Sequence, residues 1–398
     1  MIPIVVIQEL DKIKVEPSER GYNARKITRH LDDLRDKNGS LTNWQTINEK
    51  NGRLCIKLPE NKLNLKDPFD DQILAIALEQ KKYKDEYESI ALVTLDTNLR
   101  VKADAYGLGA QSYTNPEIKD LNVNNTLHIK DIDFDITDIG SKDGVECPHA
   151  LLKNQCVILY KQDGHQILAR EKNGRLKVIK SREILGIKGK NAEQKFAMEM
   201  LLDPDISLVT LQGIAGTGKS LLTLVTSLQQ VIDGQYNKLI ISRPVVAMGN
   251  QSIGYLPGTV DEKIMPYMKA IFDNLEIILM SKKIPGVKTI EDMKRSGIIE
   301  IEPLTYIRGR SIPGQIMMID ETQSLSPLEL KTIISRCGDG TKLILNGDID
   351  QIDSPYLNKY NNGLTHVVNK LKDEKVVAHI TLEKGERSHL ANLAAEKL

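Results

Sequence analysis

The chain has 398 residues, enough for two or three domains that each bury their own core. Its 54 Lys and Arg residues equal its 54 Asp and Glu residues, which excludes binding of nucleic acid through a large overall positive charge and leaves only local patches for that purpose. The longest apolar run, at residues 1–7, is too short to span a bilayer and lacks the basic leader of a signal peptide. The four cysteines form no C-x-x-C pair, so we expect reduced thiols in a cytoplasmic protein without a membrane partner.

Residues 1–116 alternate between predicted strands and predicted helices. The apolar residues 1–7 predict a buried strand, and residues 22–34 predict an amphipathic helix. Residues 70–79 predict a second helix, and residues 90–95 a second buried strand. This alternation is typical of a small parallel α/β domain.

Three carboxylates stand where such a domain places its chemistry. Glu9 follows the first predicted strand, Asp70 begins the second predicted helix and Asp96 follows the second predicted strand. The active crevice of an open α/β sheet lies at the carboxyl ends of its strands, where clustered carboxylates would hold Mg²⁺ or Mn²⁺ for cleavage of a phosphodiester. Spacing alone supports equally well an alternative in which Asp70 only caps its helix while Glu9 and Asp96 are solvated loop residues.

Four segments of this part resemble the PIN ribonuclease domain that is fused to PhoH-like ATPases: IPIVVIQELDKIK, ERGYNARKITRHLDDLR, DDQILAIAL and VTLDTNLRVKADAYGLGAQSY. The resemblance implies that Glu9, Asp70 and Asp96 bind the metal, with Thr94 and Asn98 beside the last. Such domains open with a further strand that ends in Asp-Thr-Asn, and this chain begins after that point. The resemblance therefore implies a PIN-like domain that lacks its first strand, with exposed strand edges and either a truncated start or a disabled nuclease.

Residues 117–189 change character twice. Residues 117–146 carry eight acidic residues against three lysines and predict a linker that leads into short strands. Residues 156–180 predict three short β runs separated by Asp-Gly and Asn-Gly turns, which together indicate a small β module. Nine basic residues oppose three acidic ones over residues 161–190, an excess that would follow a nucleic-acid backbone. The alternative is a merely solvated β surface, because few aromatic residues are available to stack on bases.

Residues 213–220 read GIAGTGKS and match the phosphate-binding loop G-x-x-x-x-G-K-[ST]. The apolar residues 206–211 predict a strand before the loop, and residues 221–231 predict a helix after it, which is the required context. Glycines allow backbone N–H groups to approach a polyphosphate, Lys219 would reach the β- and γ-phosphates and Ser220 would hold Mg²⁺. We expect the nucleotide to contact Gly213, Ile214, Ala215, Gly216, Thr217, Gly218, Lys219, Ser220 and Leu221.

The segment NAEQKFAMEMLL, which begins at Asn191, predicts a core helix with an apolar stripe. Its members are Phe196, Ala197, Met200 and Leu201. Gln194 lies outside that stripe and would read an adenine edge with its donor and acceptor together, an arrangement similar to the Q motif of superfamily-one helicases. A surface glutamine is the equal alternative.

Two further strands are predicted downstream, at residues 316–319 and 342–345. The first ends in Asp320 and Glu321, of which Asp320 would hold Mg²⁺ and Glu321 would orient and deprotonate the attacking water. Gln351 follows the second strand and would sense the γ-phosphate.

ATP hydrolysis also requires a cation that stabilises the negative charge of the transition state. Arg387 offers one, from its own subunit or a neighbouring one, with Arg310 and Arg336 as rivals.

The motifs SRPVVAMG, GYLPGT and YIRGRS resemble those of PhoH-like ATPases, and the resemblance extends over residues 191–398. It implies a RecA-like core, a hexameric ring and ATP-driven action on RNA. We therefore predict an α/β chain with a PIN-like domain at residues 1–116, a linker and β module at 117–189 and a P-loop ATPase domain at 190–398.

The predicted function is that of a Mg²⁺-dependent ATPase that unwinds or translocates single-stranded RNA and presents it to a PIN nuclease. One alternative is an ATP-gated RNA-binding or regulatory factor whose PIN part has no chemistry. A small-molecule kinase is a third possibility, but it would explain the phosphate loop alone.

Overall fold

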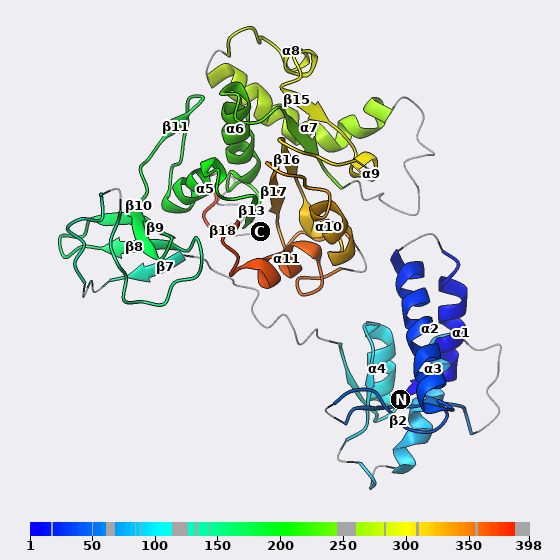
Figure 1. Cartoon of the computed structure of the whole chain (residues 1–398). Coiled ribbons are helices and arrows are strands. Elements are labelled where there is room, and N and C mark those ends of the chain that lie inside the picture. Colours follow the sequence, from blue (N-terminus) through cyan, green and yellow to red (C-terminus); the bar gives the residue numbers. More distant parts are fainter. Residues whose placement is uncertain are drawn as a thin grey trace. The chain divides into compact units, whose positions relative to one another are not determined.

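The structure is a computed structural model, shown in Figure 1. It describes residues 1–16, 19–49, 51–60, 68–83, 85–87, 89–113, 126–130, 132, 134–141, 143–244, 260–281, 284–307, 310–354 and 357–386. The chain divides into two compact units, Met1–Thr114 and Asn115–Leu398. The predicted β module and the predicted ATPase domain therefore belong to the same compact unit.

The first unit combines helices with short strands. Its helices are α1 (Ile4–Ile13), α2 (Glu19–Asn38), α3 (Phe69–Glu79), the 3₁₀ helix η1 (Gln80–Tyr83) and α4 (Thr97–Ala105). Its strands are β1 (Ile2–Pro3), β2 (Gln45–Thr46), β3 (Arg53–Leu54), β4 (Ile56–Lys57), β5 (Ala91–Val93) and β6 (Gly109–Gln111). Strands β1 and β4 form one parallel pair and β5 and β6 form another, and among the described residues these pairs do not join into one sheet.

The predicted strand at residues 1–7 is wrong for most of its length. Only Ile2 and Pro3 are extended, and α1 begins at Ile4. A short apolar run fits a buried helix as well as a strand, and here burial decides, because Val5 packs into one core with Ile73 and Ile76 of α3. Glu9 consequently lies within α1 rather than after a strand.

The second predicted strand forms, as β5, but the prediction that it is buried is wrong. Val93 is 56% exposed and Leu95 is 58% exposed. Among the described residues β5 pairs only with β6, so the alternate residues Ala91 and Val93 face outward while Leu92 packs against the core. The helices predicted at residues 22–34 and 70–79 are confirmed as α2 and α3.

The second unit begins with a four-stranded sheet of order β10-β9-β8-β7. Its strands are β7 (Thr126–Ile129), β8 (Cys156–Tyr160), β9 (Gln166–Lys172) and β10 (Arg175–Val178). The three predicted β runs are therefore confirmed. The turn between β9 and β10 has positive φ at both Asn173 and Gly174, 56° and 83°, which is the geometry that makes Asn-Gly a favoured hairpin turn.

The basic excess predicted for this module is largely neutralised by carboxylates. At least five of its nine cations form ion pairs within the second unit: Arg170, Lys172, Arg175, Arg182 and Lys188. The Arg170 side chain is only 4% exposed. These five residues do not form an unpaired cationic track for a nucleic-acid backbone.

A six-stranded parallel sheet forms the body of the second unit, in the order β15-β14-β16-β17-β13-β18. Its strands are β13 (Leu208–Gly213), β14 (Leu239–Ser242), β15 (Ile299–Ile301), β16 (Ile316–Ile319), β17 (Lys342–Gly347) and β18 (Val377–Leu382). The strands predicted at residues 206–211, 316–319 and 342–345 correspond to β13, β16 and β17. Parallel strands read as continuous apolar runs because both faces of their sheet are buried, which explains why they were recognisable.

Helices cover both faces of this sheet (Figure 1). The helices of the second unit are α5 (Ala192–Leu202), α6 (Lys219–Ile232), α7 (Val260–Ser281), α8 (Ile290–Arg295), α9 (Leu304–Ile307), the 3₁₀ helix η3 (Thr322–Ser324), α10 (Pro327–Ile334) and α11 (Gly363–Leu371). A further hairpin consists of β11 (Glu183–Ile184) and β12 (Ile187–Lys188). Val209 packs with Phe196 of α5 in one core, and its neighbour Leu208 packs with Leu330 of α10 in the other.

The β module is joined to the ATPase sheet by buried polar contacts. Arg170 on β9 forms an ion pair with Asp203, the residue after α5. Lys342 on β17 is fully buried, and its Nζ donates to the carbonyl oxygens of Leu201 and Asp203 at 2.6 and 2.7 Å. Asp203 therefore connects the module to the sheet, because its side chain pairs with Arg170 while its carbonyl oxygen accepts from Lys342.

Among the described residues, no helix is both long enough and apolar enough to cross a membrane.

Candidate nucleotide site

The phosphate loop connects the end of β13 to the start of α6. Its backbone takes positive φ at Gly216 (82°) and at Gly218 (93°), a conformation that L-residues with a side chain rarely adopt. Gly218 is also the N-cap of α6, so the loop delivers its N–H groups and the positive end of the helix dipole to the same place. A Cβ atom at Gly218 would approach Gln194 Nε2 to 3.2 Å, which is a second reason for glycine at this position.

Lys219 and Thr217 hold the loop closed on itself. Lys219 Nζ donates to the Ile214 carbonyl oxygen at 3.0 Å, and Thr217 Oγ1 donates to the same oxygen at 2.9 Å. Thr217 is fully buried, whereas the Ile214 side chain is 46% exposed. The Lys219 ammonium can therefore exchange a backbone carbonyl for a phosphate oxygen without a change in the fold of the loop.

Ser220, the second residue of α6, reaches the end of β16. Its Oγ donates to Asp320 Oδ1 at 3.0 Å. Asp320 is 6% exposed, and burial, followed by the charge of Glu321, raises the pKa of its carboxyl above the usual value, while Arg243 opposes that rise. A hydroxyl and a carboxylate side by side are hard oxygen ligands of the kind that Mg²⁺ prefers.

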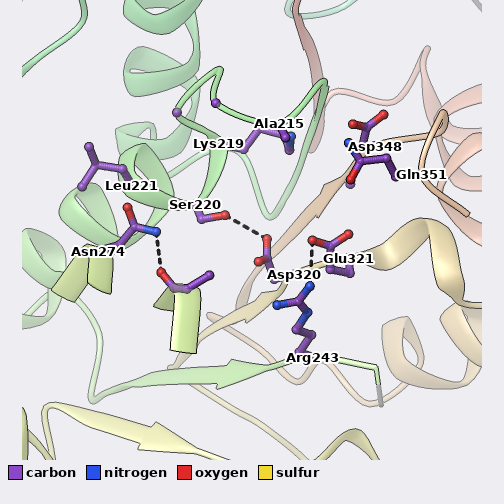
Figure 2. Close-up of a pocket in the computed structure, with 14 residues that line it drawn as sticks. Ala215, Lys219, Ser220, Leu221, Arg243, Asn274, Asp320, Glu321, Asp348 and Gln351 are labelled. Atoms are coloured by element: carbon purple, nitrogen blue, oxygen red, sulfur yellow. Dashed lines mark hydrogen bonds and ion pairs between the residues drawn. The ribbon is translucent and has the colours of Figure 1, made fainter. Parts of the chain in front are cut away.

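Glu321 has an uncommon backbone conformation for a residue with a side chain. Its φ of 56° and ψ of 40° lie in the left-handed region, and the next residues form the short helix η3. Both carboxylate oxygens are engaged, Oε1 by Arg243 Nη2 at 3.0 Å and Oε2 by Gln323 Nε2 at 2.6 Å. The carboxylate is thereby fixed at the pocket wall beside Asp320 (Figure 2).

The loop after β17 supplies the opposite wall with Asp348 and Gln351. Gln323 ties this loop to the Glu321 carboxylate, because its Nε2 also donates to the Gln351 carbonyl oxygen at 2.8 Å and its Oε1 accepts from Asp348 N at 3.1 Å. Asp348 is 5% exposed, and its Oδ2 has no hydrogen-bond partner among the described residues. A buried carboxylate oxygen without a partner is costly in a folded protein, so this atom fits a site that receives Mg²⁺ or its coordinated water.

These elements enclose one pocket, drawn in Figure 2. Its walls consist of Ala215, Gly216, Gly218, Lys219, Ser220, Leu221, Arg243, Ala270, Asn274, Asp320, Glu321, Gly347, Asp348 and Gln351. Every strand that contributes to it does so at its carboxyl end, as expected for a parallel sheet. Of the residues predicted to contact the nucleotide, six lie on the wall, whereas Gly213, Ile214, Thr217 and Gln194 do not.

Gln194 braces the loop from behind. It is 5% exposed; its Nε2 donates to the Thr217 carbonyl oxygen at 3.0 Å and its Oε1 accepts from Lys190 N at 2.8 Å. The alternative of a surface glutamine is therefore wrong. Contact with adenine stays a prediction, and it would require this amide to exchange its present partners.

The three predicted arginines have different positions. Arg387 lies outside the described residues, although Glu386 before it donates its backbone N–H to the Gly216 carbonyl oxygen at 3.1 Å. Arg310 is not on the pocket wall, and its Nη1 donates to both carboxylate oxygens of Glu302, each at 2.6 Å. Arg336 is also absent from the wall.

Sequence reasoning assigned no role to Arg243, Gln323 or Asp348. Arg243 directly follows β14, and Asp348 directly follows β17, so the rule that functional residues follow parallel strands would have singled out both. Gln323 gives no such signal, because its importance depends on the hydrogen bonds that it makes in the folded chain.

The carboxylates of the first unit are less closely assembled. Asp96 is the N-cap of α4, where its Oδ1 accepts from Leu99 N at 2.7 Å. Asp70 lies in the first turn of α3, and burial together with the charge of Asp70 raises the pKa of Glu9. Asp71, next to Asp70, binds Lys102 Nζ at 2.7 Å. Lys102 feels the charges of Asp70 and Asp96 as well. Within the described ranges no three His, Cys, Asp or Glu side chains gather closely enough to hold a metal ion, so metal binding by Glu9, Asp70 and Asp96 stays a prediction.

Comparison with known proteins gives a family for each unit. Residues 186–395 match the family described as PhoH-like protein, and residues 1–114 match the family described as PIN domain. Protein PhoH2 of Bacillus subtilis (strain 168) is 39% identical over 424 residues, which cover 100% of this chain and 94% of that protein. Protein PhoH2 of Mycolicibacterium smegmatis is 33% identical over 411 residues, which cover 100% and 91%. A solved structure, the UvsW helicase from bacteriophage T4, covers 73% of this chain and 78% of its own at 13% identity and a TM-score of 0.30. The chain therefore belongs to the PhoH-like protein family, in a form that joins a PIN domain to a PhoH-like P-loop ATPase.

Proposed function

We propose that this chain hydrolyses ATP with Mg²⁺ in the pocket described above and uses the reaction to move along or unwind single-stranded RNA. The observation that carries the proposal is the meeting of Ser220, Asp320 and Glu321 directly below the phosphate loop. Such a constellation places metal ligands and a base beside bound phosphates, which is the requirement for phosphoryl transfer to water.

Each residue has a distinct task in this reaction. Lys219 would leave the loop carbonyls and donate to the β- and γ-phosphates, while Ser220 and Asp320 would hold Mg²⁺. The metal would neutralise charge on the phosphate oxygens. Glu321 would orient the attacking water and accept its proton.

The loop after β17 would report the state of the nucleotide. Gln351 lies on the pocket wall, and its carbonyl oxygen shares the Gln323 amide with the Glu321 carboxylate. Loss of the γ-phosphate would move Gln351, and the same amide would pass the movement to Glu321. This connection offers a physical route from hydrolysis to conformational change.

The finer parts of the proposal rest on membership of the family. They comprise a hexameric ring, a cytoplasmic location, single-stranded RNA as the partner and a transition-state cation from Arg387 in its own or a neighbouring subunit. The PIN domain would cleave the delivered strand with Mg²⁺ or Mn²⁺ held by Glu9, Asp70 and Asp96.

The proposal is tested by measuring phosphate release from MgATP with and without single-stranded RNA, beside displacement of a labelled strand from a duplex with a single-stranded tail. We expect RNA-stimulated hydrolysis and strand displacement that needs ATP. Single-stranded DNA of matched sequence serves as the comparison. Hydrolysis that neither polymer stimulates would contradict action on nucleic acid while leaving the ATPase assignment in place.

A second candidate function differs from the first only in the role of the PIN domain. The chain would be an ATP-gated RNA-binding or regulatory factor in which the PIN domain docks RNA without cleaving it. The observation in its favour is that Asp96 serves as a helix cap and that Glu9, Asp70 and Asp96 do not gather into a metal site. Cleavage of end-labelled RNA by the whole chain would exclude this candidate.

A further inference from the structure

The nucleotide pocket contains an arginine that belongs to the same chain and is already paired with the proposed base. Arg243 follows β14, and its side chain is 25% exposed. Its Nη2 donates to Glu321 Oε1 at 3.0 Å, and its Nη1 donates to the Tyr267 carbonyl oxygen on α7 at 2.9 Å. Figure 2 shows the guanidinium directly below the Glu321 carboxylate. The two contacts hold the cation between the catalytic strand end and a neighbouring helix.

The pocket wall carries more negative than positive charge, and this excess indicates what Arg243 does when a nucleotide binds. The wall carries three carboxylates, Asp320, Glu321 and Asp348, against two cations, Lys219 and Arg243. A nucleoside triphosphate with its Mg²⁺ is still an anion, so its γ-phosphate would enter next to a carboxylate that must not repel it. Arg243 already stands beside Glu321, so it is placed to compensate the charge of whichever of the two groups it binds.

The chemistry of arginine allows the change of partner. A guanidinium has five N–H donors, and the two contacts above use one on each terminal nitrogen. Phosphate oxygens match the planar fork of arginine in a bidentate manner, and such charge-assisted bonds are stronger than neutral ones. The γ-phosphate is therefore a competitor for the partner that Glu321 now has.

We propose that Arg243 is the residue that recognises the γ-phosphate from within the same subunit, and that its pairing with Glu321 makes the base available only when a triphosphate is bound. Without the γ-phosphate, Arg243 occupies the Glu321 carboxylate. With the γ-phosphate, Arg243 turns to the phosphate and leaves Glu321 able to bind the attacking water. The inference rests on the proposed ATPase function and adds to Lys219 and Gln351 a further residue that distinguishes ATP from ADP.

The test compares the affinity of the whole chain for ADP with its affinity for the non-hydrolysable β,γ-imido analogue of ATP, both with Mg²⁺ and at equilibrium. We expect Arg243→Ala to lower the preference for the analogue over ADP by about 10-fold or more, the loss of charge-assisted hydrogen bonds. Arg243→Lys keeps the charge without the fork and should recover part of the preference. Thermal unfolding of each variant shows whether it is folded.

Two further variants distinguish recognition of the γ-phosphate by Arg243 from a purely structural role of its pair with Glu321. Arg310→Ala is the matched control, because Arg310 is also ion-paired to glutamate but is not on the pocket wall, and its preference should equal that of the wild type. Glu321→Gln removes the partner of Arg243, so its affinity for the analogue should stay or increase. A decrease of that affinity would show that Arg243 needs Glu321 to hold its position and would contradict the exchange.

The outcomes distinguish this inference from the function on which it rests. If wild-type chain binds both nucleotides and Arg243→Ala changes both affinities equally, Arg243 only supports Glu321 and the inference is overturned while the ATPase assignment stands. If the wild-type chain binds neither nucleotide, the proposed function fails and the inference fails with it.

Discussion

Ser220 and Asp320 lie 100 positions apart in the sequence, and the hydroxyl of the first donates to the carboxylate of the second at 3.0 Å. They meet because β13 and β16 flank the same strand, β17, in one parallel sheet. The loop after β17 places Asp348 and Gln351 on the wall of the same pocket. Three neighbouring strand ends thus supply the phosphate loop, the acidic pair and the loop of Asp348 and Gln351 to a single pocket.

Lys219→Ala should abolish ATP turnover and leave the fold intact. The ammonium donates to loop carbonyls in the structure and would donate to phosphates in the complex, so its removal should lower the rate of phosphate release by at least ~100-fold. A wild-type thermal transition would show that the loop still folds, since Thr217 retains its bond to the Ile214 carbonyl oxygen. Undiminished turnover would rule out the assigned role.

Glu321→Gln should separate binding of ATP from its hydrolysis. The amide preserves the size of the side chain but cannot accept the proton of water, so we expect near wild-type affinity and turnover slower by about 100-fold or more. Asp320→Asn is the comparison variant, because it alters a metal ligand and should instead raise the Mg²⁺ concentration needed for binding. Turnover by Glu321→Gln at the wild-type rate would show that the base has been misassigned.

Three strands of the ATPase sheet, β13, β16 and β17, could be predicted from the sequence because they are continuous apolar runs next to recognisable nucleotide-binding motifs, whereas β14, β15 and β18 were not predicted. Prediction was wrong at residues 1–7, where an apolar run of that length suits either a strand or a helix and only packing against α3 decides. The ion pair of Arg243 with Glu321 could not be predicted from the sequence, for another reason. The two residues are 78 positions apart, and their contact exists only because β14 and β16 are neighbours.

Asp203→Asn should strongly destabilise the second unit. Burial alone would raise the pKa of Asp203, but hydrogen bonds from Lys172 and Arg170 outweigh it and lower that pKa to about 2. Removal of the charge leaves buried Arg170 dependent on its longer ion pair with Glu199, at 3.8 Å, which should lower the free energy of unfolding by about 3–5 kcal/mol. Urea denaturation at pH 7 measures the change.

The matched control for this experiment is Asp205→Asn. Asp205 also pairs with Lys172, at 2.9 Å, but its side chain is 73% exposed. An exposed pair contributes about 0–1 kcal/mol, so this variant should unfold almost as the wild type does. An equal decrease in the free energy of unfolding of the two variants would mean that the buried Arg170–Asp203 pair stabilises the protein no more than an exposed pair does.

His379 should make the protein sensitive to mild acid. Its ring is buried, with Nδ1 beside the Thr210 hydroxyl at 2.8 Å, and burial lowers its pKa from 6.5 to about 4. The unfolded chain therefore binds the proton first as the pH falls, and the free energy of unfolding should decrease between pH 6.5 and 4 by about 3 kcal/mol. In urea titrations at pH 7.5, 5.5 and 4.5, His379→Asn should lack this component of the decrease.

Asp96 offers a way to separate the structural role of a carboxylate from a role in metal binding. Its Oδ1 caps α4 through Leu99 N, and asparagine caps a helix as well as aspartate does. Asp96→Asn should therefore keep the stability of the first unit, whereas Asp96→Ala should lose about 1 kcal/mol. Both variants remove the charge of Asp96, but only Asp96→Ala also removes the helix cap.

Cleavage of end-labelled single-stranded RNA by these two variants, in Mg²⁺ or Mn²⁺ with ATP, then shows what the charge does. If the carboxylate binds a metal, both variants lose cleavage, although only Asp96→Ala loses stability. If it serves only as a cap, Asp96→Asn cleaves as the wild type does. An absence of cleavage by a wild-type preparation that hydrolyses ATP would favour the RNA-binding factor, because the carboxylates of the first unit would then have no catalytic role to lose.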